Sequence, residues 1–370
     1  MNRQERIANA LTNQGLDALL IMSPTGTTYL SGCFLLTQTV IPERQAFVLL
    51  TADGASSYLV CNLEIHSAER SSRIKDIHQY VEFAEEPSAA VAELLRQKGL
   101  AKGKIGIESS KIPYSTLSHL KQSLPQVEFV GWDLEFSQML MVKEAFEVEA
   151  LAQAGQATRT AIENGMVNAS PGCRERDVAT AILTGIMDGG IVPLFNVFAS
   201  GPQMLETHAE ATTRILQPQD IVRVDMGGRL STNSYLSDMA RTAVVGESTA
   251  EQKSTYAKLC ATQSAVFEQI KPGVPISDLF NACVSTYEIE GLPFQMPHIG
   301  HGMGIGLHEA PMINGKNHTL LEEGMVLNIE PFVALPGRNE SYHIEDLAVV
   351  TPDGCRLLTQ PHTQLIRIPA

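Results

Sequence analysis

Two acidic side chains border apolar segments in the second half of the chain. Asp225 comes directly after the apolar run 221–224, and Asp238 opens another strand-like run thirteen residues later. A hairpin that joins these strands would bring the two carboxylates together. Carboxylates at close range repel, so one is normally protonated unless a cation neutralises them. Each aspartate could instead cap a turn, as Asp often does, so the other segments have to decide between the two interpretations.

The segment 297–309 places three histidines among four alternating glycines. Glycine allows another stretch of backbone, or a ligand, to approach closely. His301 and His308 are an odd number of residues apart, so in a continuous strand they would face opposite sides. We therefore expect these two imidazoles to do different jobs and not to chelate one ion together.

Two glutamates lie inside apolar, strand-like sequence. Glu330 ends the segment 325–330, and Glu345 lies at the start of the segment 343–350. Glu is almost never fully buried unless it is paired or binds a metal. Two Asp, two Glu and one His from five strands suit a pair of divalent cations such as Mn²⁺. Two metals about 3.5–4 Å apart can share a water and lower its pKa from 15.7 toward roughly 7.

The order and local contexts of these five residues resemble the pita-bread metallopeptidase family. That family includes Xaa-Pro aminopeptidases, Xaa-Pro dipeptidases, methionine aminopeptidases and creatinase. The resemblance is carried over most of residues 195–354 by the motifs Asp-x-Gly…Tyr-x-Ser-Asp, Gly-His-Gly-x-Gly…His-Glu-x-Pro, Met-Val-Leu-x-Ile-Glu-Pro and Ile-Glu-Asp…Val-Thr-x-Asp-Gly. The first half is similar to the N-terminal domain of the prolidase and creatinase branch, in which residues 23–32 match a recurring strand and turn. The resemblance therefore favours the proline-directed branch.

The resemblance implies a metal-binding role for each of the five residues. Asp225 would bind one metal ion, and His301 with Glu330 would bind the other. Asp238 and Glu345 would bridge both ions. The expected cofactor is therefore two divalent metal ions, most readily Mn²⁺, with Co²⁺, Zn²⁺ or Fe²⁺ as alternatives.

The resemblance also implies catalytic and substrate-binding residues. Glu330 would be the base for the bridging water, while His208 and His308 would stabilise the tetrahedral intermediate or hold the scissile carbonyl. His298 lies where the prolyl branch often has a substrate-contacting residue. His343 occupies the place of an Arg in many proline-directed members, so it is expected on the substrate side. Because His is smaller than Arg and titrates near neutrality, this change puts the substrate in doubt.

Other departures from the family pattern are smaller. Asp225 and Asp238 are two residues further apart than is common, which indicates a longer hairpin tip. Ser234 stands where the family usually has Gly, and Ala240 where Thr is frequent.

The elements that must position these residues form two domains, expected at 1–135 and 136–370. The first alternates helices and strands and predicts a smaller α/β domain, whereas the second is α+β with the pita-bread fold. Helices are expected at 3–15, 87–99, 144–164, from the turn 170–172 to about residue 187, from a capping box at 248–252 to about residue 270, and at 276–290. Strands are expected at 17–22, 45–50, 57–60, 104–108, 127–130, 192–199, 220–226, 239–245, 325–330, 343–350 and 364–368.

Bulk composition excludes several classes of protein. A formal net charge of −14 argues against nucleic-acid binding. We expect no membrane span, because no apolar run reaches about 18–20 residues, and no signal peptide. The six cysteines form no CxxC pair, which predicts reduced thiols and a cytoplasmic protein. The family resemblance implies a homodimer.

Three functions remain open. The first is an exopeptidase that hydrolyses the Xaa-Pro bond of dipeptides or short peptides. The second is a hydrolase of a small non-peptide amide or amidine, like creatinase or the ectoine hydrolases, since one fold can host several chemistries. The third is a non-catalytic binding module. All five metal ligands are present, which favours a metal-dependent hydrolase acting on a small peptide or small amide.

Overall fold

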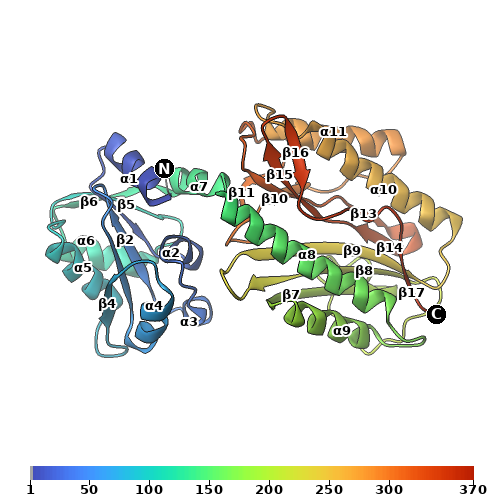
Figure 1. The fold of residues 1–370 in the computed structure, drawn as a ribbon, viewed down its shortest axis with the longest axis horizontal. Coiled ribbons are helices and arrows are strands. Elements are labelled where there is room, and N and C mark those ends of the chain that lie inside the picture. The colour runs from blue at the N-terminus through green and yellow to red at the C-terminus, as the bar shows by residue number, and fades with distance from the viewer. Residues whose placement is uncertain (1–2) are drawn as a thin grey trace. The chain divides into compact units, whose positions relative to one another are not determined.

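The computed structural model describes residues 3–370 and divides into two compact units, with the division between Met139 and Leu140 (Figure 1). Within the described chain, no helix is long and apolar enough to cross a membrane. The mixture of helices and sheets in both units agrees with the predicted fold class, α/β followed by α+β.

The first unit is built on a six-stranded mixed sheet in the order β4-β3-β2-β1-β5-β6. Its central strand β1 is buried along its whole length, as its continuous apolar sequence requires. The strands are β1 Ala18–Ile21, β2 Phe47–Thr51, β3 Ser56–Cys61, β4 Asp76–Tyr80, β5 Gly103–Ile107 and β6 Val127–Gly131. The helices are α1 Arg3–Asn13, α2 Pro24–Ser31, α3 Leu36–Val40, η1 Asn62–Glu64, α4 Ile65–Ser71, α5 Pro87–Gln97, α6 Tyr114–Ser123 and α7 Asp133–Met141.

The expected strand and turn at 23–32 was wrong, because α2 occupies this segment. The Oγ of Ser23 accepts a hydrogen bond from the N–H of Gly26, and Pro24 takes the first helical position. Gly32 ends the helix with a φ of 76°, in the left-handed region that glycine tolerates. The sequence therefore held both signals of a short helix.

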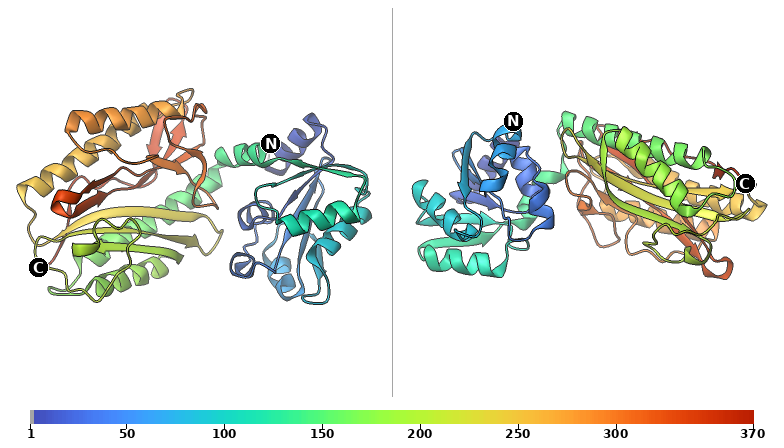
Figure 2. Two further views of the ribbon diagram at one scale, coloured as in Figure 1. Left: turned by 180° about the vertical axis from the view of Figure 1, so that it is seen from behind. Right: turned by 90° about the horizontal axis from the view of Figure 1, so that it is seen from below.

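The second unit has two halves, and the first half is a four-stranded sheet covered by two helices. The sheet runs β17-β9-β8-β7, and α8 packs along β8 and β9 while α9 packs on β7 (Figures 1 and 2). The elements are α8 Ala145–Val167, α9 Glu175–Asp188, β7 Ile191–Ser200, η2 Gly201–Gln203, β8 Ile221–Leu230, β9 Leu236–Val245 and β17 Ile366–Ile368.

Gly165 does not end the helix at 144–164, as the sequence predicted, but lies inside α8. A Cβ at Gly165 would collide with the side chain and press on the backbone of Ile182 in α9. This glycine therefore serves the close packing of α8 on α9.

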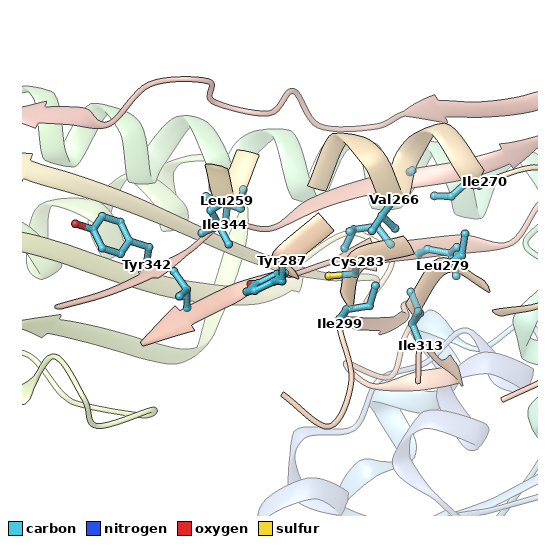
Figure 3. Close-up of a cluster of buried hydrophobic side chains, with 14 of the residues drawn as sticks. Leu259, Val266, Ile270, Leu279, Cys283, Tyr287, Ile299, Ile313, Tyr342 and Ile344 are labelled. Atoms are coloured by element: carbon cyan, nitrogen blue, oxygen red, sulfur yellow. The ribbon is translucent and has the colours of Figure 1, made fainter. Parts of the chain in front are cut away.

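The other half of the second unit combines a five-stranded sheet with two helices. The sheet runs β11-β10-β12-β15-β16, beside the two-stranded ribbon β13-β14. Helices α10 and α11 supply Leu259, Val266, Leu279 and Tyr287 to one continuous apolar core (Figure 3). The elements are α10 Ala250–Gln269, α11 Ile276–Glu290, β10 Gly300–Gly302, β11 Glu309–Met312, β12 Val326–Ile329, β13 Phe332–Leu335, η3 Pro336–Arg338, β14 Glu340–His343, β15 Asp346–Thr351 and β16 Gly354–Leu357.

Both helices of this half follow their sequence signals. Thr249 and Gln252 form the predicted capping box at the start of α10, and α11 ends at Gly291 with a φ of 68°. Strand β14 packs against β8 and β9 of the first half. Residues from the two halves therefore meet along β8, β9 and β14.

Candidate metal centre

The hairpin β8–β9 brings Asp225 and Asp238 to one face of the sheet. Asp225 is paired with Ala240, and Asp238 with Gly227, so the two aspartates are diagonal neighbours. Asp225 lies in the middle of β8 and not at its end, because pairing with β9 continues past Gly227 and Gly228. The predicted strand end at 226 was therefore wrong, while the predicted proximity of the two carboxylates is confirmed.

His301 enters the site from β10, the short strand between β11 and β12. Its Nδ1 donates to the carbonyl oxygen of Gly302 at 3.0 Å, which leaves Nε2 without a proton when the ring is neutral. That Nε2 lies 3.5 Å from Oδ2 of Asp238 and 3.6 Å from Oε1 of Glu330. A histidine that binds a metal is oriented in this way, by a hydrogen bond from its other nitrogen.

His308 lies on the same side as His301, contrary to the sequence prediction. The rings stack with centroids 4.1 Å apart and planes at 28°. Strand β10 ends at Gly302, and the following residues 304–308 bend, so strand alternation does not apply. Donor atoms of Asp238, His301 and His308 all fall within 4.8 Å of one another and form a first candidate metal group.

Glu345 lies between β14 and β15, not within one strand at 343–350 as predicted. The interruption is held by β9, because the N–H of Glu345 donates to the carbonyl of Ala240 at 3.1 Å. His343 is anchored in the same way, since its N–H donates to Oγ1 of Thr242 at 2.9 Å. Asp225, His343 and Glu345 form a second candidate metal group, again with donor atoms within 4.8 Å.

Glu330 follows β12, as predicted, and lies between the two groups. Its Oε1 faces His298 at 3.3 Å as well as His301, and its Oε2 faces His343 at 3.7 Å. Burial alone would raise the pKa of Glu330, but the imidazoles of His298 and His343 outweigh it and hold the pKa well below its usual range.

The electrostatics of the cluster call for a cation. Burial, followed by repulsion from Asp238 and other carboxylates, raises the pKa of Asp225 and of Glu345. Buried atoms that make no hydrogen bond within residues 3–370 include Asp225 Oδ1, His301 Nε2, Glu330 Oε1 and Glu345 Oε2. Buried polar atoms in proteins are otherwise almost always satisfied. A donor set of carboxylate oxygens and imidazole nitrogens with these orphaned atoms fits divalent metal ions.

A cavity of about 850 Å³ opens over the cluster. His208 and Glu210 line it from the segment that follows η2, His298 and His308 line it from the glycine-rich segment, and Leu194 lines it from β7. Its size suits a small ligand. The structure thus brings every sequence-predicted site residue to one cavity or to the carboxylate cluster beneath it, with His208 at the cavity wall.

Three buried charged groups near the site were missed from the sequence. Arg223 on β8 donates to the carbonyls of Glu206 and Thr207, directly before His208. Arg223 and Arg241 could have been recognised as buried, partnered residues from their positions inside apolar strands, because charged residues are rarely buried without a partner.

The third group, Lys143, binds Glu309 at 2.8 Å from 166 residues away, and no sequence spacing could have indicated it. Oε1 of Glu309 also accepts from the N–H of Gly306 at 2.8 Å. Because Glu309 binds both Lys143 and the backbone of Gly306, the Lys143–Glu309 pair fixes the bend that carries His308. The pKa of His308 is lowered, first by burial and then by the neighbouring His301.

Comparison with known proteins assigns both units. The profile of metallopeptidase family M24 matches residues 149–352, and that of the creatinase/prolidase N-terminal domain matches residues 3–142. A Xaa-Pro dipeptidase from Pyrococcus furiosus is 27% identical over 98% of this chain and 99% of its own length. A probable dipeptidase PepE from Mycobacterium bovis is 30% identical over 98% and 95%. The crystal structure of dipeptidase PepE from Mycobacterium ulcerans matches with a TM-score of 0.84 and 30% identity, covering 100% of this chain and 97% of that one.

Proposed function

The chain belongs to metallopeptidase family M24, and from this membership we propose that it hydrolyses the Xaa-Pro bond of dipeptides or short peptides. The observation that carries the proposal is the cluster of two Asp, two Glu and one His beneath a small cavity, in which Glu330 faces His301 at 3.6 Å. The similar Xaa-Pro dipeptidase supports the choice of bond, and the two similar PepE dipeptidases support dipeptides as substrates.

We propose that the cluster holds two divalent metal ions, with Mn²⁺ as the first choice and Co²⁺, Zn²⁺ or Fe²⁺ as alternatives. Asp225, Asp238, His301, Glu330 and Glu345 would be the ligands. When bound, such ions lower the pKa of a water molecule and polarise the attacked carbonyl. Asp238 and Glu345, buried between the two halves of the domain, are the proposed bridging ligands.

Other residues of the cavity would handle the substrate. Glu330, whose carboxylate faces three imidazoles, is the proposed base that takes the proton of the attacking water. His208 and His308 would donate hydrogen bonds to the oxygen on which charge develops. His298, half-buried at the cavity wall, would contact the substrate. His343 was predicted on the substrate side as well, and its imidazole faces the carboxylates of Glu330 and Glu345.

A small non-peptide amide is the second candidate substrate. The observation that favours it is the lack of a freely available fixed cation in the cavity lining. Arg223 is the one Arg or Lys among the described residues that line it, and two of its N–H groups already bind backbone carbonyls. A dipeptide carboxylate would normally be recognised by such a group.

We propose a homodimer in the cytoplasm, with domains at 1–135 and 136–370. All six cysteines are free thiols, which suits a reducing compartment.

The test is release of free amino acid from Xaa-Pro dipeptides, Xaa-Pro tripeptides, creatine and ectoine by Mn²⁺-loaded protein. An Asp238→Asn variant is the control, since it removes a proposed bridging carboxylate. We expect cleavage of prolyl substrates that disappears in the variant, and the preference for dipeptide or tripeptide would define the exopeptidase type. If metal-loaded protein released no amino acid from any prolyl substrate, the proposal would be overturned and small amides would be tested next.

A further inference from the structure

His343 lines the cavity from within the carboxylate cluster. Its Nε2 is 3.3 Å from Oε1 of Glu345 and 3.7 Å from Oε2 of Glu330, and its Nδ1 is 3.9 Å from Oδ2 of Asp225. The residue is 7% exposed. Three carboxylates from different elements thus surround one imidazole.

The separations fit donor atoms that share a metal ion. Two ligand atoms about 2.1 Å from one ion lie roughly 3–3.5 Å apart at tetrahedral or octahedral angles. The 3.3 Å between Nε2 of His343 and Oε1 of Glu345 falls in this range, and the 3.7 Å from the same Nε2 to Oε2 of Glu330 is slightly longer. Asp225 lies nearer to the other ring nitrogen, Nδ1, at 3.9 Å. Nδ1 of His343 is also buried and makes no hydrogen bond within the described chain.

The backbone of His343 is fixed from both sides, so its ring is presented to the cluster in a defined direction. Oγ1 of Thr242 accepts from its N–H at 2.9 Å and donates to its carbonyl at 2.8 Å. The ring of Phe332 packs edge-on against the imidazole, with centroids 5.6 Å apart. These contacts limit the directions in which the ring of His343 can point.

We infer that His343 is a metal ligand, which joins Asp225 and Glu345 at one ion of the centre. Each candidate group then supplies an imidazole ligand, His301 from the first group, which also contains His308, and His343 from the second. This inference rests on the proposed metal-dependent function, but it concerns the binding of the ion and not the choice of substrate. An additional nitrogen ligand shifts a site from hard cations toward borderline ones such as Co²⁺, Fe²⁺ or Zn²⁺.

His298 provides a matched control. Its Nδ1 also approaches Glu330, at 3.3 Å, and it lines the same cavity, but it belongs to neither candidate metal group. Replacing His298 by Gln therefore removes an imidazole beside Glu330 without removing a ligand of the second group.

The experiment titrates metal-free protein with Mn²⁺ by calorimetry and with Co²⁺ by visible absorption, without substrate. We expect two ions to bind to wild type and to His298→Gln with similar affinity. His343→Gln should lose about 100-fold or more in affinity at one site and show a changed Co²⁺ spectrum. In Co²⁺-loaded protein, the paramagnetically shifted imidazole N–H proton signals should number one fewer in His343→Gln than in wild type. The variant His343→Cys, which restores a ligand atom, should regain part of the affinity.

Unchanged affinity and spectrum in folded His343→Gln, with a raised KM, would overturn the inference and make His343 a substrate contact. Folding is checked by circular dichroism, and a misfolded Gln variant leaves His343→Cys to decide by the same two titrations. Wild-type protein that binds neither ion would overturn the proposed metallopeptidase function itself. The two failures are therefore distinguishable.

Discussion

Glu330 and His343 face each other with Oε2 3.7 Å from Nε2, while Oε1 of the same carboxylate lies 3.6 Å from Nε2 of His301. One carboxylate thus faces a histidine of each candidate metal group. Because Glu330 follows β12 and His343 ends β14, this contact joins two elements of the second half, and Asp225 and Asp238 face it from β8 and β9. The centre therefore depends on the packing of both halves and not on one loop.

Metal removal should make the stability of the protein depend on pH in a defined direction. Asp225 and Glu345 have raised pKa values in the folded, metal-free state, chiefly through burial. Their contribution to folding is fully present below the unfolded pKa of about 4 and is lost as pH rises through the folded pKa. Bound metal requires the deprotonated carboxylates and reverses this loss. We expect the difference in Tm between metal-loaded and metal-free protein to be larger at pH 8 than at pH 5.5.

The control for this measurement is the metal-free double variant Asp225→Asn/Glu345→Gln, whose Tm should decline less between pH 5.5 and pH 8 than that of the metal-free wild type. A difference between loaded and metal-free wild type that stays constant over this range would contradict the prediction.

Arg241 is hydrogen-bonded to the backbone that carries Glu345, one of the proposed metal ligands. Its fully buried guanidinium binds Asp346 at 2.8 Å and donates to the carbonyls of Glu345 at 2.6 Å and Ala240 at 2.9 Å. Arg241→Met leaves the Asp346 carboxylate buried without its cation, so we expect a loss of about 3–5 kcal/mol in the free energy of unfolding. Urea denaturation of the metal-free protein measures it.

The double variant Arg241→Met/Asp346→Leu tests the cause, because it removes both charges. It should be more stable than Arg241→Met alone, although the carbonyls of Ala240 and Glu345 still lose a donor. A double variant less stable than the single one would contradict this cause and would show that the other contacts of Asp346, such as the hydrogen bond from Thr359, outweigh the unpaired charge.

The residue types of the proposed centre could be predicted from the sequence because charged side chains that interrupt apolar strands are rarely buried without a partner. The position of each of these residues within its strand or loop was harder to predict. The bend at 304–308 and the gap at 344–345 depend on contacts with Lys143 and with β9, which lie far away in the chain. For this reason, strand alternation predicted that His308 faces the side opposite His301, which was wrong. The prediction of a single strand at 343–350 likewise missed the interruption between β14 and β15 at which Glu345 lies.

Helix ends followed local rules more closely, as Thr249 and Gly291 show at α10 and α11. Gly165 was misread because its purpose is contact with Ile182 of the neighbouring helix, which no local pattern contains.

Gly227 is expected to be intolerant of any side chain. It pairs with Asp238, and a Cβ there would collide with the backbone oxygen of Ser237 and with the ring of Phe195. Gly227→Ala should therefore cost about 1–3 kcal/mol in the free energy of unfolding, or more, and weaken metal binding by separating β8 from β9. Gly354→Ala is the matched control, since a Cβ at Gly354 meets nothing within 4 Å. Equal stability of the two variants would contradict the packing argument.

Arg223 is expected to act through His208. It is 1% exposed, packs with its guanidinium carbon 5.2 Å from the centre of the Phe332 ring, and binds the two carbonyls before His208. Burial lowers the pKa of Arg223 to about 10, so the group is still charged at neutral pH. Arg223→Met frees the 206–208 segment, and displacement of a catalytic group by about 1 Å can cost up to 100-fold in rate. We expect kcat on an Xaa-Pro dipeptide to fall between about ten- and 100-fold, with metal content unchanged.

A double-mutant cycle with His208→Ala decides whether the two residues act together. If Arg223 works by positioning His208, Arg223→Met should add little to the loss in His208→Ala, because residues that act as a unit are not additive. Arg367→Met, which removes an exposed ion pair with Glu247, is the control and should leave kcat unchanged. Additive losses, or a loss seen with the dipeptide but not with its C-terminal amide, would instead make Arg223 the residue that binds the substrate carboxylate.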